Sequence, residues 1–332
     1  MGLVVLALLC LGAAKTFALP GARQQAQKPA SSDVDAVTRL NEQVVLLVDH
    51  GKLDEALSVG KQALDTAGKR LGSEHNLVGV AAHNLATVYF AKKQYSDAAK
   101  LYQRSLSIFE KTLRPNDPKL ADELFGLAWS SYALGEVNKT ESCLLRSYSI
   151  RETANGAEST EAAEALYVLG QFYQKSGNGN KAVQFYKRAI PIFEKRPGEN
   201  ETRLGELLEK CSCALLQTGK KQEAASMELR SQILLHKRSP DSVLGPVLQG
   251  KAVFRAEPVY PSAAKHERVY GTVIVEVIVD ETGKVVTSRP LCGPDLLVPA
   301  SVEAARNWRF TPTTLSGKPV KVIGTITFNF NL

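Results

Sequence analysis

The chain has 332 residues, 44% of them hydrophobic, so it is long enough for more than one domain and apolar enough to give each a core. Its net charge of +7 comes from 41 Lys and Arg against 34 Asp and Glu that are spread along the chain, which excludes a strongly basic nucleic-acid-binding face. The five His residues are scattered and have no neighbours at the spacing of a catalytic triad or a metal site. The sequence therefore predicts no enzyme, no metal site, no cofactor and no nucleic-acid partner.

The chain begins with an apolar run from Gly2 to Ala14, followed by the small residues Thr16 and Ala18. This run has the length of a signal-peptide core and is shorter than the roughly 20 residues that span a bilayer. Residues 1–18 are therefore predicted to be a signal peptide, and a short membrane anchor stays open because no Lys or Arg precedes the run. Residues 19–32, rich in Gln, Ala, Pro and Ser, predict a flexible tether.

Residues 33–238 contain a repeat with a period of 42 residues. Tyr102 and Ile108–Lys111 recur as Tyr186 and Ile192–Lys195, at twice that period. Small residues recur in the same register in two series, Ala56, Ala98, Thr140, Ala182 and Ala224, and Ala63, Ser105, Ser147, Ala189 and Ser231. Each unit has two stretches of helical periodicity joined by a polar turn, so the sequence predicts five stacked helical hairpins.

The motif Leu169-Gly170, followed by Tyr173, Ala182 and Ala189, resembles the tetratricopeptide repeat, and the long period resembles the repeats of kinesin light chains. The resemblance implies an all-α solenoid whose concave surface is lined by the first helix of each hairpin. The residues predicted to line this groove and to bind a protein partner are His83, Phe90, Phe125, Trp129, Tyr132, Tyr167, Gln171 and Gln174. Packing of some of them between hairpins or against the tether is the alternative.

A different pattern follows a linker at residues 239–251. Residues 272–279 predict a strand, 280–283 a hairpin turn and 284–288 the paired strand. Leu296–Trp308 predicts a helix, and Val320–Leu332 a last strand with one face on that helix and a more polar second face. Residues 252–332 are thus predicted to form a small α+β domain with an antiparallel sheet.

Five motifs of this region occur in the order typical of one family: Pro258-Val259-Tyr260-Pro261, Gly271-Thr272-Val273, Asp280–Lys284, Trp308–Pro312 and Gly317–Val320. They resemble the TonB C-terminal domain, whose members bind a receptor peptide that adds a strand to the sheet edge. The residues that the resemblance assigns to this binding are Pro258, Tyr260, Pro261, Ile323, Thr325, Thr327 and Asn329. A core position is the alternative for Tyr260 and is expected for Trp308.

Four cysteines follow the N-terminal segment: Cys143, Cys211, Cys213 and Cys292. Cys211 and Cys213 are two apart in a helical pattern, so they point to nearly opposite faces and cannot bridge to each other. Buried thiols are the favoured interpretation. A disulfide that involves Cys143 or Cys292 stays open.

These features predict a TonB-like periplasmic protein in outer-membrane transport, whose partner is an outer-membrane TonB-dependent receptor or another envelope protein. The alternative is a periplasmic tetratricopeptide scaffold that recruits a protein partner without energy transduction. Hairpins replace the long spacer of an energy transducer, and the apolar run is short. Tethering to the inner membrane, contact with its motor complex and binding to peptidoglycan all stay open.

Overall fold

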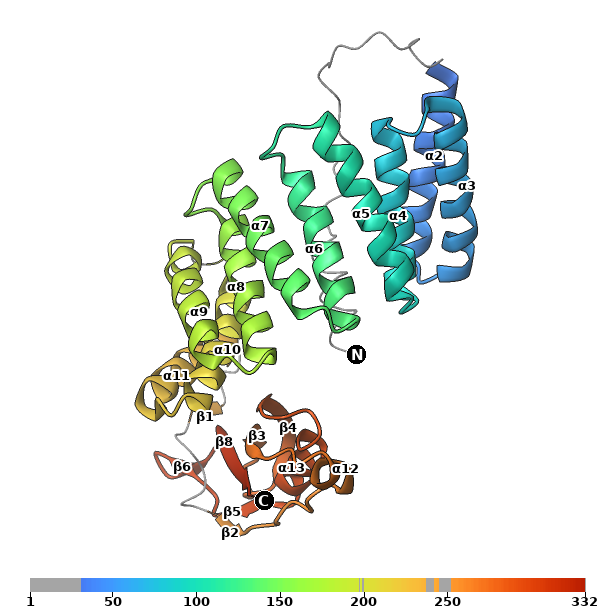
Figure 1. Cartoon of the computed structure of the whole chain (residues 1–332). Coiled ribbons are helices and arrows are strands. Elements are labelled where there is room, and N and C mark those ends of the chain that lie inside the picture. The colour runs from blue at the N-terminus through green and yellow to red at the C-terminus, as the bar shows by residue number, and fades with distance from the viewer. Residues whose placement is uncertain (1–30, 197, 199, 237–241, 245–251, 332) are drawn as a thin grey trace. The chain divides into compact units, whose positions relative to one another are not determined.

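The computed structural model describes residues 31–196, 198, 200–236, 242–244 and 252–331 (Figure 1). The chain divides into two compact units, one that ends at Ala165 and one that begins at Leu166. The predicted signal peptide and most of the predicted tether lie outside the described residues. Ser31 and Ser32, placed in the tether by the sequence, instead begin the first described helix.

The first unit contains α2 (Ser31–Asp49), α3 (Leu53–Leu71), α4 (Asn76–Ala91), α5 (Tyr95–Thr112), α6 (Pro118–Ala133), α7 (Val137–Asn155) and the start of α8 (Thr160–Lys175). The second unit continues with the rest of α8, α9 (Gly179–Glu194), α10 (Glu201–Gln217) and α11 (Lys221–His236). Within the described residues these ten helices form five consecutive hairpins. The predicted tetratricopeptide fold is therefore confirmed.

The small residues of the repeat lie where helices pack closely. Every member of the series from Ala56 to Ala224 is fully buried. In the other series, Ser hydroxyls also donate hydrogen bonds to main-chain oxygens 26 residues earlier, from Ser105 to Gly79 at 2.9 Å and from Ser231 to Gly205 at 2.8 Å. The 42-residue period therefore reflects a repeated contact between the two helices of a hairpin.

The C-terminal part of the second unit is built on a four-stranded sheet of β1 (Ser242–Leu244), β8 (Lys321–Phe330), β3 (Gly271–Val279) and β4 (Val285–Cys292), in that order. β3 pairs antiparallel with β4, as the predicted hairpin requires, and also antiparallel with β8. β1 was not predicted, and it pairs with the start of β8 in the parallel direction.

One face of this sheet carries the core of the domain. α13 (Val298–Asn307) packs on it, and Val273, Val275 and Trp308 are among the buried side chains. Trp308 is 4% exposed and its Nε1 donates to the Ala256 oxygen at 2.8 Å, so the predicted core position of this residue is confirmed.

Short elements surround the sheet. They are β2 (Ala252–Phe254), which pairs with β5 (Arg309–Phe310), the short helix α12 (Ser262–His266), and the pair β6 (Thr314–Leu315) and β7 (Lys318–Pro319).

The second face of the sheet differs from the prediction. It was expected to be the more polar face, yet Cys213 and Leu216 of α10 pack on it against Ile274 of β3 and Leu291 of β4. The last helical hairpin and the sheet therefore share a buried interface within the second unit. The division into compact units falls inside α8, whereas the sequence placed the linker between domains at residues 239–251.

Candidate protein-binding sites

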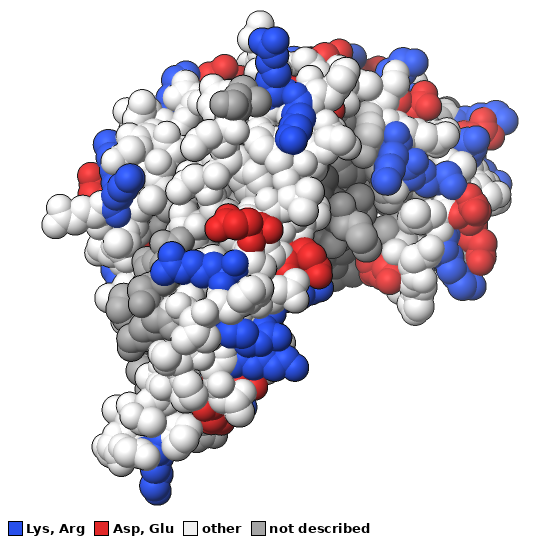
Figure 2. All heavy atoms as spheres, turned by 90° about the horizontal axis from the view of Figure 1, so that it is seen from below, with Lys and Arg blue, Asp and Glu red and all other residues white. Residues whose placement is uncertain are grey.

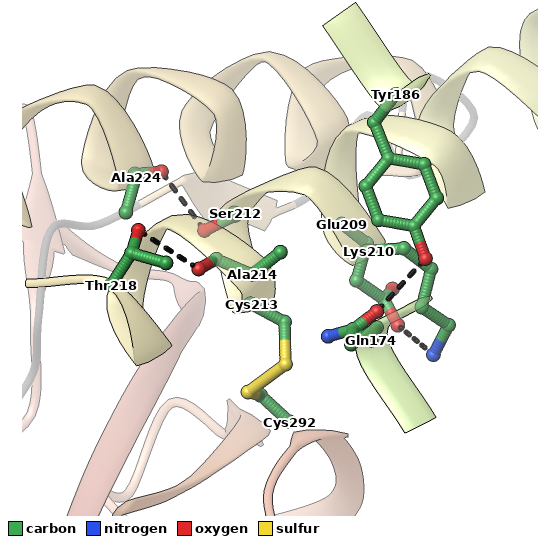
Figure 3. The surroundings of a disulfide bond; sticks show 10 residues. All are labelled: Gln174, Tyr186, Glu209, Lys210, Ser212, Cys213, Ala214, Thr218, Ala224 and Cys292. Carbon is green, nitrogen blue, oxygen red and sulfur yellow. Dashed lines mark hydrogen bonds and ion pairs between the residues drawn. A yellow bond between two sulfur atoms is a disulfide. The ribbon is translucent and has the colours of Figure 1, made fainter. Parts of the chain in front are cut away.

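A disulfide joins the last hairpin to the edge of the sheet (Figure 3). Cys213 of α10 and Cys292 of β4 are bonded, with their Cα atoms 5.4 Å apart and a sequence separation of 79. The favoured prediction of buried thiols was wrong for these two residues, and the structure contains a disulfide that involves Cys292, the alternative that the sequence left open. The prediction that Cys211 and Cys213 do not bridge to each other is confirmed.

Two other cysteines, Cys143 and Cys211, are free and buried, as predicted. Burial raises the pKa of both thiols, that of Cys211 to about 11. The reactive thiolate is therefore disfavoured at neutral pH, and both residues serve packing.

Beside the disulfide, Arg289 of β4 bridges two buried carboxylates from different parts of the second unit. Its Nη1 lies 3.0 Å from Glu209 of α10, and its Nη2 lies 3.2 Å from Glu276 of β3. Burial disfavours the charged guanidinium, but the two carboxylates outweigh this effect and raise the pKa of Arg289. Charge-assisted hydrogen bonds thus tie α10 to the sheet. The sequence carried no signal for this group, since its members lie far apart along the chain.

The predicted receptor residues on β8 are unequally accessible. Ile323 and Thr325 are only 1% and 3% exposed, and Thr325 hydrogen-bonds to Glu228 of α11. Thr327 is half-buried and Asn329 is exposed. The side chains of Ile323 and Thr325 therefore face the protein interior, because the last hairpin covers the face that was expected to be open.

The main-chain groups along the edge of β8 differ from its side chains in accessibility. One edge pairs with β3 along Val322–Phe330. The opposite edge holds β1, with Ser242 opposite Lys321 and Leu244 opposite Ile323. Beyond Ile323, no strand among the described residues pairs with this edge. The edge of β8 that was predicted to receive the receptor peptide is thus occupied at its start by β1, a strand of the same chain.

Tyr260 is half-buried and holds its segment in place. Its hydroxyl donates to the Val269 oxygen at 2.7 Å, and its ring packs edge-on against Phe330 at 5.3 Å between centroids. Pro258 and Pro261 on either side are half-buried too.

Three apolar residues near this segment are exposed and were missing from the predicted site: Val253 at 65%, Phe254 at 57% and Val259 at 82%. They lie in or after β2, in the stretch that precedes the Tyr-Pro motif. Exposed aliphatic and aromatic side chains close together in sequence are typical of a contact surface.

In the first unit, the predicted groove residues of α6 form a continuous aromatic row. The Trp129 ring lies edge-on to Phe125 at 6.1 Å and to Tyr132 at 5.6 Å between centroids. Trp129 is only 4% exposed and Phe90 of α4 only 5%, so neither side chain is accessible to a partner. The Nε1 of Trp129 is buried without a hydrogen-bond partner among the described residues. Binding of a protein partner to this aromatic row stays a prediction.

His83 of α4, also a predicted groove residue, pairs with a carboxylate of α6. Its Nδ1 lies 2.8 Å from Glu123 Oε1, and Glu123 is 2% exposed. Burial lowers the pKa of His83, but the neighbouring Glu123 carboxylate outweighs burial and raises it above 6.5. The second oxygen of Glu123 has no partner within the part of the chain that the structure describes.

In the second unit, two of the three predicted groove residues contact their own fold. Tyr167 is 2% exposed, and the Arg203 guanidinium lies 4.3 Å from the centre of its ring. Gln174 accepts a hydrogen bond of 2.8 Å from the Tyr186 hydroxyl (Figure 3). Gln171 is half-buried, and its Oε1 is buried without a partner among the described residues.

Charged side chains of both signs are mixed on the face that Figure 2 draws. Figure 2 shows Lys and Arg side chains in separate groups with Asp and Glu among them. Within the described ranges, no three His, Cys, Asp or Glu side chains gather in a way that could hold a metal ion. None of the described helices combines the length and the apolar character needed to cross a membrane.

Two protein families match the chain. The tetratricopeptide repeat matches residues 40–111, 78–153, 124–195 and 161–231, and the Gram-negative bacterial TonB protein C-terminal family matches residues 256–332. Both are families of non-catalytic domains, which suggests that the chain is not an enzyme.

Solved structures share the helical fold. A kinesin light chain-type protein of Podosopora anserina with nearly identical repeats covers 62% of this chain and 97% of its own, with a TM-score of 0.56 and 22% identity. BtubC from P. vanneervenii covers 64% of this chain and 90% of its own, with a TM-score of 0.56 and 20% identity. At such identities the likeness is one of fold.

Among relatives by sequence, the RxLR effector protein SFI4 of Phytophthora infestans is 24% identical over 48% of this chain and 48% of its own length. Protein KINESIN LIGHT CHAIN-RELATED 1 of Arabidopsis thaliana is 23% identical over 60% of this chain and 32% of its own length. The chain thus spans half or less of these relatives. It belongs to the tetratricopeptide repeat family, and residues 256–332 form a domain of the TonB C-terminal family.

Proposed function

We propose that this protein is a TonB-like periplasmic protein that binds a peptide of an outer-membrane receptor by strand addition to β8. The observation that supports the proposal is the parallel pairing of β1 with β8, in which a short strand lies along this edge. Main-chain hydrogen bonds supply much of the affinity in such complexes. Burial of Ile323 and Thr325 is compatible with this mode, since strand addition uses main-chain groups.

The exposed apolar residues Val253, Phe254 and Val259 support a second contact with the receptor. They lie in the stretch that also touches the receptor in the family that the chain resembles. Side-chain contacts there would add selectivity to the main-chain pairing at β8.

The Cys213–Cys292 disulfide supports the periplasmic part of the proposal. Disulfides persist in oxidising compartments and are rare in the cytosol. The apolar run at Gly2–Ala14 also supports export, because its length is that of a signal-peptide core.

The proposal is tested with isotope-labelled protein of residues 19–332 and synthetic peptides that copy the periplasmic N-terminal segments of outer-membrane receptors. We expect a bound peptide to shift the amide resonances of Gly324–Asn329 together with those of Val253 and Phe254. The matched control is the same peptide with N-methyl groups at alternate residues, which lacks the donors for strand addition and should lose binding. Binding that leaves the β8 amides unchanged would contradict the proposal.

The second candidate function is a scaffold whose repeats recruit a protein partner without energy transduction. The half-buried Phe125 and Tyr132 of α6 favour it, because aromatic side chains that share one helix face are suited to anchoring an extended peptide. A partner of this kind would shift resonances of α4 and α6 and leave β8 unchanged. Phe125→Ala, which removes one aromatic ring of this face, would weaken its binding.

A further inference from the structure

We propose that β1 is a built-in competitor of the receptor peptide, so that a peptide strand that extends along β8 to Ile323 is captured only when Ser242–Leu244 leaves this edge. The inference rests on the proposed function, strand addition to β8. It adds a regulatory step that uses the chain's own linker.

The competition follows from the register of the strands. Leu244 lies opposite Ile323, and Ile323 is the first of the β8 residues assigned to the receptor peptide. An added strand that reaches Ile323 needs the same outward main-chain N–H and C=O groups that β1 occupies. Two strands cannot share one edge at the same residues, since each main-chain group there takes one strand partner.

The attachment of β1 to the repeats connects its release to the last hairpin. α11 ends at His236 and β1 begins at Ser242, so residues 237–241 join them. Five residues span at most about 18 Å, which keeps β1 close to the hairpin after release. On the opposite edge of the sheet, the Cys213–Cys292 disulfide holds β4 to α10. Release of β1 therefore opens one sheet edge while the covalent attachment at the other edge remains.

The residues around the shared position also indicate what the edge accepts. Val322 and Ile323 point to opposite faces of the sheet and are only 5% and 1% exposed, so both faces are apolar at this point. The occupant of this stretch is Ser242-Val243-Leu244, with two consecutive aliphatic residues. The fitting partner is an extended peptide with consecutive aliphatic residues that runs parallel to β8.

The test uses oxidised protein of residues 19–332 and a fluorescent peptide with the sequence of residues 239–248, which copies β1. Val243→Pro combined with Leu244→Pro removes both main-chain donors of the strand, whichever of the two faces β8. Val243→Thr combined with Leu244→Val is the matched control, because it keeps both main-chain donors and places β-branched residues, which favour strands, at both positions. We expect the proline variant to bind the peptide at least tenfold more tightly than either the natural protein or the control.

A second measurement needs no substitution. Trypsin sites at Lys237, Arg238 and Lys251 flank β1 in the sequence. Saturating peptide should speed cleavage there severalfold in the natural protein, because the peptide displaces β1.

The outcomes separate the two proposals. Equal affinity in all three proteins, with unchanged cleavage, overturns the competition and leaves strand addition to β8 standing. Absence of binding in all three overturns both.

Discussion

Cys213 and Cys292 connect the last tetratricopeptide hairpin to the edge strand of the TonB-like sheet through a bond that spans 79 residues of sequence. The bond lies beside Arg289, which bridges Glu209 of the same helix and Glu276 of the same sheet. Covalent and ionic contacts therefore hold the same interface, and each can be removed separately.

Replacement of both bonded cysteines, Cys213→Ser with Cys292→Ser, should lower the free energy of unfolding by about 2–4 kcal/mol, because the unfolded chain gains the freedom of a long loop. Urea denaturation followed by Trp308 fluorescence in a Trp129→Phe background measures this loss. The control is Cys211→Ser, which alters a free buried thiol of the same helix and should cost less. An unchanged midpoint in the double serine variant would show that the bond adds no stability.

Arg289→Met should destabilise the same interface by roughly 1–2 kcal/mol, because the buried carboxylates of Glu209 and Glu276 lose the cation that bridges them. The expected loss of stability is at the low end for a buried ion pair, since the Arg289 side chain is 43% exposed. Thermal unfolding measures the loss. The triple variant that adds Glu209→Gln and Glu276→Gln should recover part of it, because neutral amides replace the stranded carboxylates. No recovery would mean that lost packing, and not lost charge, causes the effect.

Glu123→Gln should lower the pKa of His83 below 6.5, because burial remains while the carboxylate that stabilises the imidazolium is gone. In the natural protein the raised pKa contributes stability that is fully present below pH 6.5 and is lost as pH rises through the folded-state pKa. Nuclear magnetic resonance titration of the histidine rings measures both proteins. Asp65→Asn, at an exposed carboxylate of α3, is the control and should leave His83 unchanged. A His83 pKa that stays above 6.5 in Glu123→Gln would contradict the pairing.

Gly126→Ala and Gly68→Ala should have opposite effects on the first unit. A Cβ at Gly126 of α6 would lie 2.5 Å from the Tyr102 ring, which must then move, at a cost of about 1–3 kcal/mol. A Cβ at Gly68 of α3 meets no atom within 4 Å, so alanine there should stabilise the helix by about 0.5–1 kcal/mol. Chemical denaturation compares the two variants. Equal effects would argue against the tight contact between Tyr102 and α6.

The helical repeat was predictable because its signal is local and recurs. Residues such as Ala56, Ala98 and Ala182 must be small wherever two helices of a hairpin meet, so the constraint appears at a fixed period in the sequence. The strands of the TonB-like domain were predictable for a similar reason, since alternation along β3 and β8 reports the faces of a sheet.

The candidate sites were predictable only in part. The aromatic row Phe125, Trp129 and Tyr132 does share one face of α6, since helical spacing determines it. Whether a residue on such a face is open depends on what packs against it, and Trp129 is buried. Tyr260 likewise contacts Val269 and Phe330, a position that the motif around it does not reveal.

The sequence by itself determined the five hairpins, the antiparallel strands and the two families, because each depends on periodicity or on motifs within a short stretch of chain. Only the tertiary structure decided that Cys213 pairs with Cys292, that the last hairpin covers Thr325, and that Ser242–Leu244 occupies the edge of β8. These contacts join segments far apart in sequence. Their formation depends on how the folded helices and strands pack against one another. Packing between distant segments leaves no periodic pattern and no motif in a single sequence.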